Sequence, residues 1–130
     1  MSRLLFLAVV LAATALFTGC STLADAQAAR GTGESRIYDR PYEVVWIAAS
    51  ETVRDSGLTL VSEEKEKGLI LARGGVSAFS WGENVAVFVE DIGGRARTRV
   101  EVSSKRALAT NITAKNWETK LLESLDKKLK

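Results

Sequence analysis

The sequence predicts a small two-layer α+β domain, in which an antiparallel sheet of four to five strands carries two helices on one face. Residues 42–56 and 117–129 repeat apolar side chains at helical spacing, and the segments around them show the short apolar runs or strict alternation of strands. Short turns between consecutive strands favour antiparallel pairing, with both helices packed on the same face. The expected order over residues 36–130 is β-α-β-β-β-β-α.

A short strand at residues 36–38 precedes the first helix. Asp39 is a typical capping residue and Pro41 is favoured in a first helical turn, so the helix is expected to begin here and to end near Ser56. Gly57 supplies the stop. The residues that recur on one side of this helix, and are therefore expected in the core, are Tyr42, Val45, Trp46, Ala49 and Val53.

The next two strands are expected to form a hairpin with a charged tip. Residues 58–61 and 69–72 are mostly apolar, and the turn between them at residues 64–68 has the sequence Glu-Lys-Glu-Lys-Gly. Residues 58–72 therefore predict the second and third strands of the sheet.

The last two strands show the clearest alternation. Residues 83–92 place Val85, Val87 and Val89 on one face and Ala86, Phe88 and Glu90 on the other, and a Gly93-Gly94 turn follows. In the next strand, the residues expected to face inward are Thr98, Val100 and Val102. Those expected to face water are Arg97, Arg99, Glu101 and Ser103.

A final helix with a lysine-rich outer face closes the domain. Asn111 or Thr113 is a candidate N-cap. The apolar residues that line one side of this helix are Trp117, Leu121, Leu122, Leu125 and Leu129. Trp117 and Trp46 both lie on apolar helix stripes, so both are expected in the core.

The N-terminus has the features of an export signal. Arg3 is followed by an uncharged apolar stretch at residues 4–17, which is typical of a signal-peptide core. The stretch is shorter than the roughly 20 residues that a spanning helix needs. Residues 1–19 are therefore predicted to be a signal peptide.

The segment Leu16-Phe17-Thr18-Gly19-Cys20 resembles the lipobox of bacterial lipoproteins, although Phe17 stands where leucine is usual. The resemblance implies that the Cys20 thiol receives a diacylglyceryl group before cleavage, which anchors the protein in the membrane. Ser21 is not the aspartate that favours inner-membrane retention, so the outer membrane, facing the periplasm, is the expected location. An ordinary cleaved signal with a chance cysteine is the alternative.

Residues 20–35 are expected to be the lipidated cysteine and a flexible linker. The stretch is small, polar and without periodicity, and a coil of this length would let the domain float about 20 Å from the bilayer. Gly31 and Gly33 are not expected to form a phosphate loop, because Arg36 stands where a third glycine is required.

Composition excludes several classes of site. The chain has no histidine, one cysteine and a formal charge of +2, which argues against His-based catalysis, a metal site, an internal disulfide or nucleic-acid binding. The adjacent pairs Glu63-Glu64 and Glu90-Asp91 are expected to point to opposite faces of their strands, so neither pair can share a proton. We therefore expect no enzymatic activity and no cofactor.

Two features are candidates for partner binding. Arg97 and Arg99 share a strand face, and this basic patch fits anionic lipid or an acidic partner unless it only protects the strand against edge pairing. Phe79 and Trp81 lie two residues apart in a glycine-flanked segment, so in an extended chain both rings point to one side. They either complete the core or form an aromatic anchor for a partner.

The chain also resembles a family of short bacterial lipoproteins that is catalogued as a domain of unknown function. The resemblance rests on residues 38–46 (YDRPYEVVW), 65–70 (KEKGLI) and 116–129, which includes Asn116-Trp117. More distantly, the order of helices and strands is similar to that of the domains of BamC, a lipoprotein of the outer-membrane barrel assembly machine. These motifs consist of core and capping residues, and the family offers no catalytic residue to transfer.

Three functions fit these expectations. The first is an accessory or adaptor lipoprotein whose tethered domain binds other envelope proteins. The second is a domain that binds a lipid or another small apolar ligand between its helices and sheet. The third is a structural lipoprotein that supports envelope integrity without a specific partner.

Overall fold

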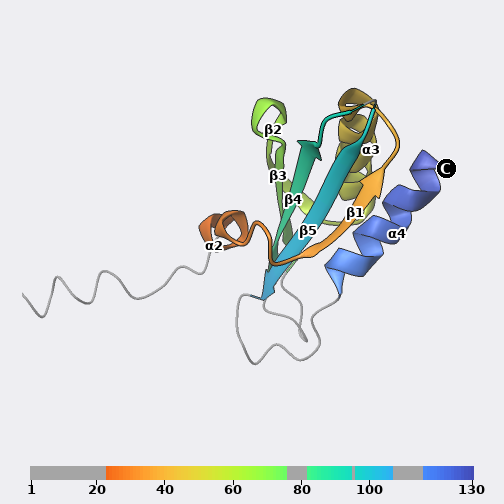
Figure 1. The fold of residues 1–130 in the computed structure, drawn as a ribbon. Coiled ribbons are helices and arrows are strands. Elements are labelled where there is room, and N and C mark those ends of the chain that lie inside the picture. Colours follow the sequence, from red (N-terminus) through yellow and green to blue (C-terminus); the bar gives the residue numbers. More distant parts are fainter. Residues whose placement is uncertain (1–22, 76–81, 95, 107–115) are drawn as a thin grey trace, which may run out of the picture.

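The computed structural model describes residues 23–75, 82–94, 96–106 and 116–130. These residues form a five-stranded antiparallel sheet with strand order β1-β5-β4-β3-β2, so the first strand lies at an edge. The elements in chain order are α2 (Leu23–Ala28), β1 (Glu34–Tyr38), α3 (Tyr42–Asp55), β2 (Thr59–Glu64), the 3₁₀ turn η2 (Lys65–Lys67), β3 (Leu69–Gly74), β4 (Glu83–Asp91), β5 (Thr98–Arg106) and α4 (Trp117–Leu129). From β1 onward the predicted α+β class and element order are confirmed (Figure 1).

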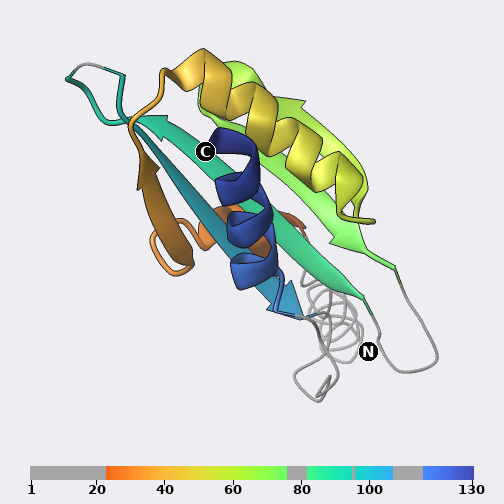
Figure 2. The ribbon, with the colours of Figure 1, turned by 90° about the vertical axis from the view of Figure 1, so that its right-hand side faces the viewer.

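The main core lies between the sheet and helices α3 and α4, which cover the same face of the sheet (Figure 2). The predicted alternation of β4 and β5 is confirmed, because Val87 pairs with Val102 and Val89 with Val100, and all four are buried. The strictly buried members contributed by the helices and β3 include Val45, Val53, Ile70 and Leu122. Burying such a side chain contributes about 1.5–3 kcal/mol, so this layer supplies most of the driving force for folding.

Helix α3 begins two residues later than a cap at Asp39 would require. Pro41 occupies the N-cap position with φ −63° and ψ 151°, and no side chain caps the helix. Asp39 therefore lies too far before the first turn to accept from its amides, and its carboxylate lies 3.5 Å from the Arg97 Nε instead. The predicted stop is confirmed: Ser56 is the C-cap, and Gly57 has a φ of +89°.

Helix α4 is capped by Asn116, so the predicted cap at Asn111 or Thr113 is wrong. The Asn116 Oδ1 accepts a hydrogen bond from the Thr119 backbone amide at 3.2 Å. Asn111 and Thr113 themselves lie outside the described residues. The predicted apolar stripe is confirmed for Trp117, Leu121, Leu122 and Leu125, which are buried, whereas Leu129 is only partly buried.

The face of the sheet opposite to α3 and α4, called the second face below, is also covered by the chain. The prediction of a flexible linker at residues 20–35 is therefore wrong from Leu23 onward. Residues 23–28 form helix α2, and Ala26 and Ala29 are buried on this face. Together with Ala26, the sheet residues Leu69, Leu71, Ala86 and Phe88 form a second apolar cluster. A helix of six residues is too short to show periodicity in the sequence, and it is stabilised by packing rather than by its own propensity.

The covering segment also changes the exposure of β5. Glu101 and Ser103, which were expected to face water, are 9% and 1% exposed. They are buried because the chain after α2 runs over this strand and then joins the sheet as β1, which begins at Glu34 rather than Arg36. Residues 23–33 are called the N-terminal arm below.

Candidate functional site

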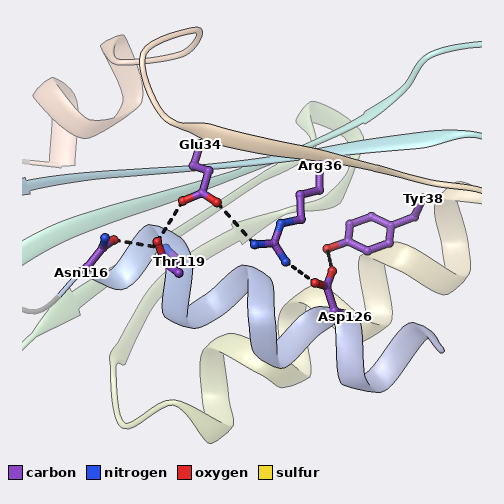
Figure 3. Close-up of polar contacts among 6 residues, drawn as sticks. All are labelled: Glu34, Arg36, Tyr38, Asn116, Thr119 and Asp126. Atoms are coloured by element: carbon purple, nitrogen blue, oxygen red, sulfur yellow. Dashed lines mark hydrogen bonds and ion pairs between the residues drawn. The ribbon is translucent and has the colours of Figure 1, made fainter.

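A polar cluster joins the edge strand β1 to helix α4 (Figure 3). Glu34, Arg36 and Tyr38 alternate along β1, so their side chains lie on the side that faces α4. Arg36 forms an ion pair with Asp126, and the Tyr38 hydroxyl donates to the other oxygen of that carboxylate at 2.7 Å. At the other end of the cluster, the Thr119 hydroxyl donates to Glu34 at 3.0 Å.

The electrostatics of this cluster favour a structural contact between β1 and α4 over acid–base chemistry. Burial, followed by the hydrogen bond to Asp126, raises the pKa of Tyr38 well above its usual range. The phenol therefore stays protonated at physiological pH and acts as a hydrogen-bond donor. Asp126 has a donor on each carboxylate oxygen, so its charge is used to hold β1 against α4.

An open groove lies where the end of the N-terminal arm, the start of α3, the η2 turn and the end of β4 meet. Its volume is about 420 Å³, and charged side chains that include Arg30, Lys65, Lys67 and Glu90 line much of it. Lys65 and Lys67 are paired with Glu43 and Glu64 at 2.5 and 2.8 Å. Cations and carboxylates thus alternate around the groove, which does not define a site for one sign of charge.

The space between the helices and the sheet is nearly filled. The cavity found there measures about 10 Å³ and is lined by core side chains such as Val53, Val87 and Leu121. This volume is close to that of a single water probe and far below the 300 Å³ or more of a typical ligand site. The described core therefore has no room for a bound lipid.

The predicted basic residues lie at the surface but do not form a concentrated patch. Arg97 precedes β5 and pairs with Asp39, and Arg99 on β5 lies 3.5 Å from the Glu90 carboxylate. Glu101, next on the same strand face, is buried under the N-terminal arm. Arg97 and Arg99 are thus each neutralised by a nearby carboxylate.

Phe79, Trp81 and Cys20 all lie outside the described residues. The other two tryptophans behave as predicted, because Trp46 and Trp117 are 7% and 5% exposed. The Trp117 indole also donates a hydrogen bond to the buried carboxylate of Glu83.

The adjacent carboxylates Glu63 and Glu64 diverge as expected. Glu63 turns toward α3, where it accepts from Ser50 and lies 2.6 Å from Arg54, whereas Glu64 pairs with Lys67. Within the described ranges, no three His, Cys, Asp or Glu side chains come close enough to hold a metal ion. In that same part of the chain, the helices are too short or too polar to cross a membrane.

Sequence reasoning missed both the polar cluster and the role of Glu101. The spacing of Glu34, Arg36 and Tyr38 does indicate a polar strand face, and Thr119 and Asp126 lie seven residues apart on one helix face. These signals do not tell that the strand and the helix face each other. Their partnership requires the fold.

Comparison with models of protein families and with curated proteins found no match for this chain. The resemblance to short bacterial lipoproteins therefore stays a prediction.

Proposed function

We propose that this protein is a bacterial lipoprotein of the outer membrane, whose periplasmic α+β domain is a non-catalytic adaptor for other envelope proteins. Support for the anchor comes from the lipobox-like segment ending at Cys20, the sole cysteine in the chain. Acyl chains on Cys20 would hold the domain at the membrane surface, where it meets its partners.

The filled interior is the observation that favours an adaptor over a ligand carrier. A carrier of lipids or small apolar molecules needs an apolar cavity, but within the described residues the space between helices and sheet measures about 10 Å³ and the open groove is lined mostly by charged residues. Binding through the outer surface requires no cavity. Val44 and Ile47 on α3 are 45% and 55% exposed, and they offer apolar contact to a protein partner.

The anchor is tested by substitution at the cleavage site. Cys20→Ser should release the protein from the membrane fraction, and the native N-terminal peptide should carry the mass of acyl chains. Ser21→Asp should keep the acyl mass and move the protein to the inner membrane. A native protein without acyl mass contradicts the proposal.

The adaptor role is tested by photo-crosslinking in living cells, with the crosslinking residue placed at Ile47 or Trp81 and Cys20 left intact. Discrete heavier bands that contain a second envelope protein are expected. Acyl lipids that co-purify with the delipidated domain would favour the ligand carrier instead. An absence of bands combined with an envelope defect on deletion would favour the structural lipoprotein.

A further inference from the structure

The N-terminal arm connects the predicted anchor to the domain, and it is fixed to the sheet rather than free. Helix α2 projects from the face of the sheet opposite to α3 and α4 (Figure 1). Ala26 is fully buried against Leu69, Leu71, Ala86 and Phe88, and the Arg30 guanidinium lies 4.6 Å from the centre of the Phe88 ring.

Glu101 holds the second half of the arm. Its carboxylate accepts hydrogen bonds from the backbone amides of Gly31 at 2.6 Å and of Gly33 at 3.2 Å. Both glycines are required by this path: Gly31 has a φ of +89°, and a Cβ on Gly33 would overlap the Val102 carbonyl. A buried carboxylate with two amide donors is a strong, specific attachment.

The docked arm leaves little chain between the domain and the anchor. Three peptide steps separate Cys20 from Leu23, the first residue of α2, and they span at most about 11 Å. A free coil from Cys20 to β1 would instead have a typical reach of about 20 Å and no preferred orientation. Docking of the arm thus limits Cys20 to within about 11 Å of Leu23, on the side of the sheet that carries α2.

We propose that the arm orients the domain so that the second face of the sheet lies against the phospholipid headgroups, with α3 and α4 directed away from the membrane. This inference rests on the proposed lipid anchor at Cys20. It assigns the headgroup layer as the partner of the sheet face that carries α2. The surface of α3, with Val44 and Ile47, then remains open to envelope proteins.

Two arginines of the second face, Arg73, which is exposed, and Arg99, which is partly buried, fit this partner. Arg73 follows Leu69 and Leu71 at strand spacing, so it lies on the same face, and it is exposed. Arg99 shares the face of Glu101. Guanidinium groups bind phosphate oxygens readily, so headgroup phosphates are suitable ligands for Arg73, whereas at Arg99 they would compete with the Glu90 carboxylate 3.5 Å away.

The orientation is tested on the full-length lipid-modified protein in vesicles of phosphatidylethanolamine and phosphatidylglycerol that contain a small share of nickel-chelating lipid. Acylation consumes the only native thiol, so Arg73→Cys and Ile47→Cys each introduce a single site for a nitroxide label. Both positions are exposed, but they lie on opposite layers of the domain. Relaxation of the label by nickel is expected to be several-fold stronger at position 73 than at position 47.

The role of the arm is tested by adding Glu101→Ala to both labelled proteins. The difference between positions 73 and 47 should then collapse, while Glu101→Gln, which keeps an acceptor oxygen, should retain part of it. Circular dichroism and thermal unfolding establish that each variant is folded. If Glu101→Ala does not fold, Arg30→Ala is used in its place, because it removes the contact between the arm and the Phe88 ring.

Three failures are distinguishable. A protein without acyl mass on its N-terminal peptide overturns the proposed anchor. An acylated protein with equal relaxation at both labels, or with stronger relaxation at position 47, overturns the orientation alone. A contrast that persists unchanged in folded Glu101→Ala overturns the role of the arm.

Discussion

The Tyr38 hydroxyl donates a hydrogen bond to Asp126 at 2.7 Å across 88 residues of sequence. Tyr38 ends β1, the edge strand that follows the N-terminal arm, and Asp126 lies in α4, near the C-terminus. The adjacent ion pair between Arg36 and Asp126 strengthens the same connection. The first strand after the predicted anchor in the sequence, β1, is therefore held to helix α4 as well as to β5.

Replacing Asp126 should weaken the connection between β1 and α4. Asp126→Ala removes the acceptor of both Arg36 and Tyr38, and we expect a loss of about 1–2 kcal/mol in the free energy of unfolding, since the carboxylate is partly exposed. Urea denaturation measures this. Lys127→Ala, at the exposed neighbouring position, should change stability by less than about 0.5 kcal/mol. Equal effects of the two substitutions would contradict the role of the cluster.

Stability should also decrease at high pH because of Tyr38. Burial and the hydrogen bond to Asp126 raise the pKa of Tyr38 in the folded protein above the value of about 10 in the unfolded chain. The folded state then binds a proton that the unfolded state loses, so this stabilisation is fully present below pH 10 and declines as the pH rises further. Tyr38→Phe should reduce this decline in urea titrations between pH 9 and about 11. An identical decline in both proteins would show that other groups cause it.

The sequence predicted those features that depend on neighbouring residues. The alternation of Val85, Val87 and Val89 and the stripe of α4 follow from local periodicity, and both are confirmed. Glu101 follows the same alternation but is buried, because a segment about 70 residues away packs over it. Alternation assigns a residue to a face of the sheet, but it does not tell what covers that face.

The polar cluster between β1 and α4 could not be predicted from local sequence for the same reason. Arg36 and Asp126 are 90 residues apart, and each alone is an ordinary exposed charge in a strand or helix. The Asp39 cap failed for a different reason, because Pro41 fixed the start of α3 and left Asp39 outside capping range. Capping rules identify candidate residues within a few positions, and the backbone path selects among them.

Gly68 is expected to be intolerant of a side chain. It ends the η2 turn with a φ of +63°, and an added Cβ would overlap the Val89 carbonyl oxygen. Left-handed backbone costs alanine about 1–2 kcal/mol, so with the overlap Gly68→Ala should lose more than about 2 kcal/mol in urea denaturation. Gly75→Ala is the matched control, since nothing lies within 4 Å of its Cβ position. A Gly68→Ala protein as stable as the control would exclude this packing of η2 against β4.

The docking of α2 can be broken without touching the main core. Ala26 is fully buried on the second face, whereas Ala28 in the same helix is exposed. Ala26→Asp places an unpaired carboxylate in an apolar cluster, and releasing the arm costs less than burying that charge. Trypsin should therefore cleave after Arg30 much faster in Ala26→Asp than in Ala28→Asp. The rest of the domain should stay protected in both variants, because the core under α3 and α4 is a separate apolar cluster. Equal cleavage rates in the two variants would mean that the arm is not held by Ala26, and global unfolding of Ala26→Asp would mean that the two apolar clusters fold as one unit.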